Sequence, residues 1–300
     1  MTIKPVPLAT WPTPLEPAMR LAGAIGLEQL WVKRDDLTGL GGGGNKVRKL
    51  QYTCAQAVKA GATGVVTTGA PQSNHARLTA AAAARLGLSC TLVLAGTAPE
   101  AMRGNLLLDE LAGARIVWAG TDPLAEVAAA QDGYVIPFGG TNAVSAQGYV
   151  DCAKELLTQL PDLDTVVVAL GSGGTMAGLV AQLGPERVLG VDVGALPDPR
   201  ATVAGLLNEM WAAAEGGMWA AGGTELGAVS ESLRIDSTQV GAGYATVTEP
   251  VRAAMTLVAR TEGIFLDPTY TGRAMAGLRA AKPRGKVVFL HTGGLPRLLV

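Results

Sequence analysis

Short runs of β-branched and aliphatic residues alternate with longer stretches of helical pattern along most of the chain. The apolar runs fall at 30–36, 64–70, 89–95, 115–120, 165–170, 187–194 and 286–294. The helical stretches fall at 45–62, 74–88, 104–114, 122–131 and 142–160. Runs that are apolar throughout are typical of strands buried on both faces, and their alternation with helices predicts parallel sheets joined by crossover helices.

The strand patterns fall into two groups, which predicts an α/β protein of two lobes, each a mostly parallel twisted sheet flanked by helices. We expect a large domain from residues 1–44 plus 156–300 and a small domain from residues 45–155. Parallel sheets of this kind bind ligands at the carboxyl ends of their strands, so we expect the active site in the cleft between the lobes.

Composition narrows the function classes. A formal net charge of −1 argues against an electrostatic grip on nucleic acid or an anionic membrane. Three widely spaced cysteines and two histidines give neither a disulfide framework nor a metal-binding spacing, so we expect a cytoplasmic protein without a metal. The proline-rich N-terminus lacks the apolar core of a signal peptide. The uncharged window 165–184 contains GSGG, which fits a strand, loop and helix better than a membrane span.

Four glycine-containing turns follow or precede these elements: GGGGNK at 41–46, GAPQSNH at 69–75, GSGGT at 171–175 and HTGG at 291–294. The first is no Walker A loop, because Asn45 precedes Lys46 and Val47 follows it. The third is no dinucleotide fingerprint, because Met176 stands where the last glycine belongs. A helix that starts after a glycine loop is still a general anion site, which favours phosphate binding at 171–175. Taken alone, GGGGNK is equally compatible with a flexible linker.

A lysine held near a phosphate-binding loop points to pyridoxal phosphate. This cofactor forms a Schiff base with a lysine, needs its phosphate anchored, and stabilises negative charge at a substrate's α-carbon.

Five motifs in order carry a family resemblance: GGNKVRKL, APQSNHARLTAAAAARLGL, ALGSGGTMAGL, GIFLDPTYTGRAMAGL and FLHTGGLPRLL. They resemble the D-cysteine desulfhydrase and 1-aminocyclopropane-1-carboxylate deaminase family of pyridoxal phosphate enzymes. The resemblance implies fold type II, similar to the tryptophan synthase β-subunit, and a homodimer that acts on a small amino acid.

The resemblance assigns a cofactor site residue by residue. Lys46 would be the Schiff-base lysine and could take the substrate's α-proton, and Lys49, three residues later, would contact the phosphate. Asn74 would bind the pyridine 3′-oxygen, with a helix N-cap as the competing role. The remaining expected cofactor contacts are Gly171, Ser172, Gly173, Gly174, Thr175 and Thr292.

The substrate side follows in the same way. Ser73 matches the family's active-site serine, which approaches the substrate carboxylate, and Asn74 and His75 would line the same site. His75 has a structural role as its alternative. Tyr270 matches one of two active-site tyrosines, and Tyr244 is expected to be the second, although GAGYATVTE departs from the family's GYGVPN.

Two positions separate the reactions. The deaminases have sequences like YEG and HLGG at these positions, whereas this chain has Thr271 in YTG and Thr292 in HTGG. Thr271 is expected to contact the substrate. A hydroxyl near the pyridine nitrogen stabilises its protonated form less than a carboxylate does, which suits elimination of a good leaving group. The resemblance therefore implies a lyase converting D-cysteine to pyruvate, ammonia and hydrogen sulfide. The enzymatic alternatives are the aminocyclopropane carboxylate deaminase and L-cysteate sulfo-lyase reactions, and the alternative from another class is a non-catalytic phosphate or nucleotide binder.

Overall fold

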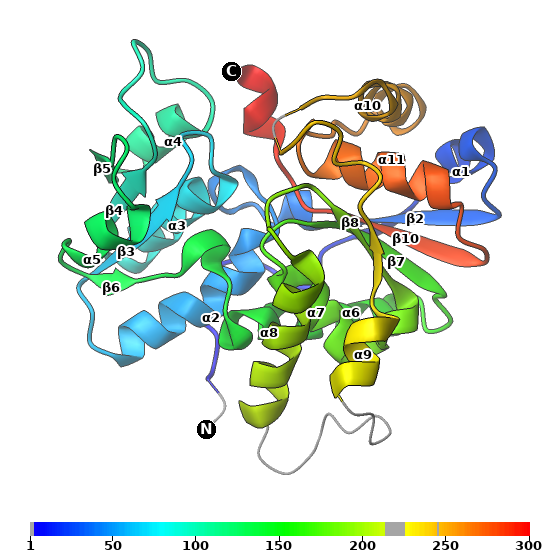
Figure 1. Ribbon diagram of the computed structural model, residues 1–300, viewed down its shortest axis with the longest axis horizontal. Helices are drawn as coiled ribbons and strands as arrows, with labels where there is room; N and C mark the ends of the chain where they lie inside the picture. The colour runs from blue at the N-terminus through cyan, green and yellow to red at the C-terminus, as the bar shows by residue number, and fades with distance from the viewer. Residues whose placement is uncertain (1–2, 214–225, 245) are drawn as a thin grey trace.

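Two sheets form the framework of the protein in a computed structural model, which describes residues 3–213, 226–244 and 246–300 (Figure 1). The larger sheet has six strands in the order β1 (Leu15–Pro17), β2 (Gln29–Arg34), β10 (Lys286–His291), β7 (Thr165–Leu170), β8 (Val188–Asp192) and β9 (Arg234–Asp236). All neighbours pair in parallel except β1 with β2. The smaller sheet has four parallel strands in the order β5 (Arg115–Trp118), β4 (Ser89–Leu94), β3 (Gly64–Gly69) and β6 (Tyr134–Val135).

Helices cover both faces of each sheet, because the central strands are apolar on both sides. On the larger sheet, one face carries α1 (Met19–Ile25), α10 (Glu249–Glu262) and α11 (Thr271–Ala281). The other face carries α6 (Ala143–Gln159), α7 (Gly174–Leu183), α8 (Pro199–Ala213) and α9 (Leu226–Ser232). On the smaller sheet, α2 (Lys46–Lys59), α3 (Asn74–Leu86) and α4 (Asn105–Leu111) pack opposite α5 (Leu124–Ala129).

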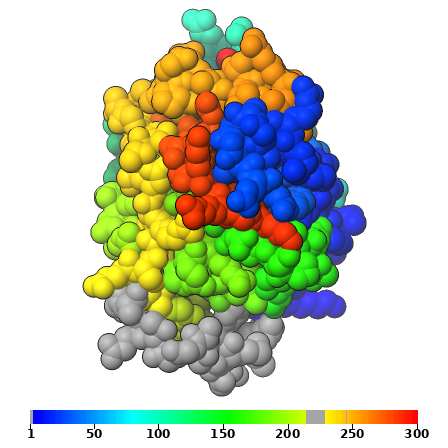
Figure 2. Space-filling model, turned by 90° about the vertical axis from the view of Figure 1, so that its right-hand side faces the viewer, coloured from blue at the N-terminus to red at the C-terminus, as the bar shows by residue number. Residues whose placement is uncertain are grey.

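The middle of the larger sheet joins segments from opposite ends of the chain. Strand β10 lies between β2 and β7, with Val288 in register with Trp31 on one side and Val166 on the other. Figure 2 shows this arrangement from outside, with the blue N-terminal elements beside the red and orange C-terminal ones. The prediction of an α/β fold with mostly parallel sheets is confirmed.

The predicted domain boundaries stay a prediction. Residues 45–155 contain all four strands of the smaller sheet, but α6, whose Ala146 and Val150 lie in this range, packs into the core of the larger sheet beside α7. No described helix has the length and apolar composition needed to cross a membrane.

A buried ion network fixes the start of α2. The Asp35 carboxylate accepts hydrogen bonds from Arg48 Nε (2.8 Å), the Tyr149 hydroxyl (2.7 Å) and the Thr13 hydroxyl (2.9 Å). Arg48 reaches on to Glu155 through Nη1 at 2.8 Å. Burial alone would raise the pKa of Asp35, but the charge and hydrogen bonds of Arg48 outweigh burial and lower this pKa. The network thus ties the loop before α2, α2 itself and α6 into one unit.

Candidate active site

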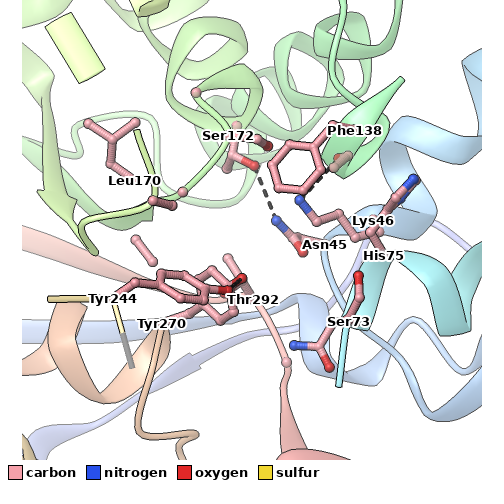
Figure 3. A pocket seen from close by; sticks show the side chains of 18 of the residues that line it. Asn45, Lys46, Ser73, His75, Phe138, Leu170, Ser172, Tyr244, Tyr270 and Thr292 are labelled. Atoms are coloured by element: carbon pink, nitrogen blue, oxygen red, sulfur yellow. Dashed lines mark hydrogen bonds between the residues drawn. The ribbon is translucent and has the colours of Figure 1, made fainter. Parts of the chain in front are cut away.

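A cavity of about 340 Å³ opens where strands of both sheets end (Figure 3). Its walls come from the loops after β2, β3, β6, β7, β8 and β10, so it lies at carboxyl ends of parallel strands, as expected for this architecture. Most of the predicted site residues line it: Lys46, Ser73, Asn74, His75, Gly171, Ser172, Gly173, Thr175, Tyr244, Tyr270 and Thr292. Lys49, Gly174 and Thr271 do not line it.

The glycine run before α2 lets the backbone pass through a crowded place. Gly43 has φ +74°, and a Cβ there would lie 1.8 Å from the carbonyl oxygen of Asp36. Gly44 has φ +133°, and the next amide, that of Asn45, donates to the Thr292 carbonyl at 3.1 Å. Only glycine fits such a path. The run is therefore a loop of defined conformation, and the interpretation as a flexible linker is wrong. It places Lys46 in the first turn of α2, where the side chain lines the cavity.

Lys46 and Lys49 form a pair of amines, and neither makes an ion pair with an acidic side chain among the described residues. Lys46 Nζ donates to the Gly139 carbonyl at 3.1 Å, and burial lowers its pKa to about 8. Lys49 Nζ donates to the Thr141 hydroxyl at 2.8 Å, and its pKa is lowered by burial and then by the charge of Lys46. The Thr141 and Ser172 hydroxyls are 2.7 Å apart. Two amines and two hydroxyls without a counter-ion form a place for an anion.

The turn at the start of α3 presents polar groups to the cavity. Ser73 is the N-cap of this helix, because its hydroxyl accepts from the Ala76 amide at 3.1 Å, so the N-cap alternative for Asn74 is wrong. The Asn74 side-chain oxygen accepts from Asn105 Nδ2 at 3.0 Å, which leaves the Asn74 amide nitrogen as the donor. Asn105 also holds Gln72 in place through hydrogen bonds of 2.8 and 2.9 Å.

His75 is buried and neutral in this setting. The Thr67 hydroxyl donates to the Ile136 carbonyl at 2.9 Å, so it accepts from His75 Nε2 at 2.8 Å. Burial lowers the pKa of His75, and the charges of Lys46 and Lys49 lower it further. The ring thus carries its proton on Nε2 and is held as part of the cavity wall.

Two tyrosines meet on the opposite wall. The hydroxyls of Tyr244 and Tyr270 are hydrogen-bonded, and their rings are in edge contact with centroids 6.0 Å apart. Burial, followed by the influence of Tyr244, raises the pKa of Tyr270, so this phenol keeps its proton. Arg273 fixes the loop around Tyr244 by donating to the carbonyls of Gly243, Tyr244 and Thr246 at 2.6–3.0 Å.

The two subfamily-marking threonines lie in different places. Thr292 lines the cavity. Thr271 is fully buried at the start of α11, where its hydroxyl donates to Asp267 Oδ1 at 2.8 Å. The Asp267 carboxylate also accepts from the amides of Thr269, Tyr270 and Thr271, each at 2.9 Å. Thr271 therefore supports the turn that carries Tyr270, and the structure does not bring it to the expected substrate position.

Comparison with known proteins settles the family. The sequence profile described as "Pyridoxal-phosphate dependent enzyme" matches residues 6–293. The chain belongs to this family of pyridoxal phosphate-dependent enzymes. Two D-cysteine desulfhydrases of Klebsiella pneumoniae are 42% and 41% identical to it over an alignment of 316 positions, which covers 96% of this chain and 93% of each relative.

Solved structures agree with this membership. The crystal structure of an ACC deaminase homologue superposes with a TM-score of 0.86 at 34% identity and covers 98% of this chain and 93% of its own. Maize serine racemase, at 20% identity and a TM-score of 0.67, covers 94% of this chain and 88% of its own and shares the fold. The predicted family resemblance and cofactor are confirmed.

The geometry of this pyridoxal phosphate enzyme fits its cofactor. Lys46 lines the cavity, where its amine would be available to the cofactor's aldehyde. Lys49, Thr141 and Ser172 gather beside the first turn of α7, where backbone amides and the helix dipole favour a phosphate. A Cβ on Gly174 would lie 3.0 Å from Lys49 Nζ and 2.9 Å from Thr141 Cγ2, so the missing side chain keeps this cradle open.

Gly174→Ala should weaken cofactor retention while leaving the fold largely intact, because its methyl group would fill the cradle. We expect a loss of roughly 10-fold or more in affinity, as for one strained charge-assisted contact. Equilibrium dialysis against pyridoxal phosphate would measure the affinity.

Gly178→Ala on the same helix is not a suitable control, because its Cβ would lie 2.3 Å from the Ala146 carbonyl. Gly205→Ala on α8 is suitable, since a Cβ there meets nothing within 4 Å. Equal retention by both variants would place the phosphate elsewhere.

The lowered pKa of Lys46 gives a second prediction. A pKa of about 8 leaves roughly one tenth of this amine neutral at pH 7, against roughly one in 3,000 for an ordinary lysine. In cofactor-free protein, acetylation of Lys46 should rise about tenfold per pH unit below pH 7, about fivefold from pH 7 to pH 8, and then level off. Peptide mass spectrometry with N-acetyl-lysine amide as internal reference would measure it. A rise that parallels the reference to pH 10 would contradict the prediction.

Several residues of this site were not predicted from the sequence. Phe138 and Gly139 follow β6 and line the cavity, and Thr141 binds Lys49. The motif PFGGT resembles the four glycine turns that were singled out, so the same criterion would have found it. Asn105 and Asp267 carry no such pattern, because each acts through a contact that only the fold creates.

Proposed function

We propose that this enzyme is a lyase that converts D-cysteine and water to pyruvate, ammonia and hydrogen sulfide. The observation that carries the proposal is the near full-length identity of 42% to a protein named D-cysteine desulfhydrase, together with a cavity that joins Lys46, the α3 turn and the tyrosine pair. The non-catalytic phosphate binder is a poor alternative, since it would not need an amine of lowered pKa facing this cavity.

The chain's own residues divide the work in this proposal. Pyridoxal phosphate, when bound, draws electron density from the substrate's α-carbon and so makes the bond to its hydrogen acidic. The α3 turn at Ser73 and Asn74 offers amide and side-chain donors to the substrate carboxylate. Lys46, with its neutral amine accessible near pH 8, takes the α-proton. Tyr270, which keeps its phenolic proton, donates to the sulfur as it leaves, and Tyr244 holds that phenol in position.

A substrate panel tests the proposed reaction. The holoenzyme would receive D-cysteine, L-cysteine, L-cysteate and 1-aminocyclopropane-1-carboxylate, and pyruvate, sulfide and 2-oxobutanoate would be measured. We expect equal amounts of sulfide and pyruvate from D-cysteine and little 2-oxobutanoate. Faster opening of the cyclopropane than release of sulfide would overturn the proposed reaction.

Tyr270→Phe should slow sulfide release without loss of bound cofactor.

Thr292 is a better position than Thr271 for testing how the protein tunes the cofactor's pyridine ring. Replacing Thr271 by glutamate would set a second carboxylate beside Asp267 in a site with no exposure, which would destabilise the protein. Thr292→Leu instead changes only a cavity-lining side chain. If its hydroxyl tunes the cofactor for elimination, this variant should lose sulfide release while still binding the cofactor.

The proposal includes a cellular setting. The three cysteines are buried and unpaired, as in proteins of a reducing compartment, which supports a cytoplasmic enzyme. The family resemblance supports a homodimer. We also propose that the large and small domains, 1–44 plus 156–300 and 45–155, close around a small amino acid in the cleft between them.

A further inference from the structure

His291 is a buried histidine beside the cavity that the proposed reaction does not use. It is the last residue of β10, is 2% exposed and does not line the cavity itself. The next two residues, Thr292 and Gly293, do line it. The imidazole ring is therefore placed to act on the cavity wall through the turn that follows it.

Two hydrogen bonds decide where the His291 ring carries its proton. The Gly293 amide donates to Nδ1 at 3.1 Å, so this nitrogen has a free lone pair. Nε2 lies 3.2 Å from the Phe265 carbonyl, which can only accept, so Nε2 carries the hydrogen. Both contacts thus require the same neutral form of the ring. An imidazolium carries hydrogen on both nitrogens and cannot accept from Gly293.

The charged groups that act on the ring come from two neighbouring segments. Arg34 and Asp36 lie at and just after the end of β2, the strand that pairs with β10, and Asp267 lies in the loop before α11. Asp36 Oδ2 is 3.9 Å from Nε2, but Arg34 already binds this carboxylate at 2.8 and 2.9 Å. Burial lowers the pKa of His291 below its ordinary value of 6.5, against the opposing effect of Asp36. The neutral ring is therefore the form present at pH 7.

The turn after His291 packs against the glycine run that precedes α2. The Thr292 carbonyl accepts from the Asn45 amide at 3.1 Å. A Cβ on Gly293 would lie 2.9 Å from the Cα of Gly44, so the two backbones are in direct contact. Loss of the hydrogen bond from Gly293 to His291 would free this turn to move, and with it the Thr292 hydroxyl and the start of α2.

We propose that His291 is a positioning residue for pyridoxal phosphate: its Nδ1 holds the turn 292–294 against the loop before α2, and this hold requires the neutral ring. Because the folded protein favours the neutral form, the hold is complete above pH 6.5 and is lost as the pH falls through the lower pKa of the folded protein. The inference rests on the family's cofactor and is independent of which amino acid the enzyme converts.

Asparagine and glutamine at position 291 separate the two bonds of the ring. The amide oxygen of asparagine takes the position of Nδ1 and can accept from Gly293, whereas the amide of glutamine extends to the position of Nε2 and can bond Phe265 instead. Equilibrium dialysis of the cofactor-free proteins against pyridoxal phosphate at pH 7 would give the dissociation constants. His291→Asn should bind within about threefold of wild type. His291→Gln should bind roughly 10-fold more weakly or worse, since the buried Gly293 amide loses its acceptor.

An acid series tests the need for a neutral ring. From pH 7 to pH 5, wild type should lose at least about fivefold more affinity than His291→Asn, whose amide does not titrate. Titration of the cofactor's phosphate and of His75 affects both proteins alike and cancels in this comparison. Asp36→Asn should move the acid loss to lower pH, because Asp36 raises the pKa of His291.

Equal weakening by asparagine and glutamine, or an equal acid loss in wild type and His291→Asn, would overturn the inference. If His291→Gln does not fold, the acid series decides alone. Nitrogen-15 NMR of histidine-labelled wild type at pH 7 should show the proton of His291 on Nε2, and the chain's two histidines are told apart by the signals missing from His291→Asn. A proton on Nδ1 would also refute the inference. Cofactor binding is the readout throughout, so a failure of the proposed reaction with D-cysteine leaves the role of His291 standing.

Discussion

Replacing Lys46 by alanine should abolish turnover, with a loss of at least ~10²–10⁴-fold from the missing proton acceptor alone. The structure gives the reason: the shaped glycine loop places this amine, rather than any other described lysine, on the cavity wall. The variant should still fold, because Lys46 forms one hydrogen bond, to the Gly139 carbonyl, and no ion pair with a described residue. Steady-state release of pyruvate from D-cysteine would measure the loss.

Lys59→Ala is the matched control for this experiment. Lys59 lies at the end of the same helix and is exposed, so its removal should leave turnover and cofactor content unchanged. Borohydride reduction of the wild-type holoenzyme, followed by peptide mass spectrometry, should find the pyridoxyl group on Lys46. A pyridoxyl group on another lysine, or wild-type turnover in Lys46→Ala, would refute the assignment.

Asp35→Ala should destabilise the protein by about 3–5 kcal/mol, the cost of leaving a buried cation without its partner. Asp35 is fully buried, and its loss would strip Arg48 of two hydrogen bonds of 2.8 and 2.9 Å, although Glu155 would remain. Because α2 carries Lys46, the same change should also weaken cofactor retention. Urea unfolding of the cofactor-free protein would give the free energy, and dialysis of the holoenzyme would give the retention.

The companion variant Asp35→Ala with Arg48→Met removes both charges and should recover part of the lost stability. An Asp35→Ala protein as stable as wild type would show that Glu155 alone suffices for Arg48.

The lowered pKa of Asp35 sets the sign of the pH effect. Its stabilising contribution is present above its ordinary pKa of 3.8 and is lost as the pH falls through the lower value in the folded protein. Acid unfolding of wild type should therefore have a component below pH 4 that the double variant lacks.

Local patterns in the sequence were enough to predict the sheets and to single out Lys46, which lines the cavity. The strands β3, β7 and β10 are buried at nearly every position, and the glycine turns that follow β3 and β7 form part of the cavity. The three-residue strands β1 and β9 escaped prediction because they are short edge strands without a buried apolar run. Helices α8, α10 and α11 were not delimited, although their apolar faces pack on the larger sheet.

The site was harder to predict wherever a residue acts through a distant partner. Lys49 could be inferred from its spacing to Lys46 along one helix. Asn105 could not, since Gln72 and Asn74, which it binds, lie more than 30 residues away in sequence. Thr271 shows the opposite error. Its place in a motif implied contact with the substrate, whereas the turn capped by Asp267 directs its hydroxyl into the protein.

The central position of β10 has a consequence for how the enzyme matures in a cell. Until residues 286–291 have left the ribosome, β2 and β7 lack the strand that joins them, so the larger sheet stays in two pieces. Thr292 and Arg297, which follow that strand, emerge later still. The nascent chain therefore exposes the open edges of β2 and β7 until β10 has been made, and the wall of the cavity is complete only after the residues that follow β10 have been added.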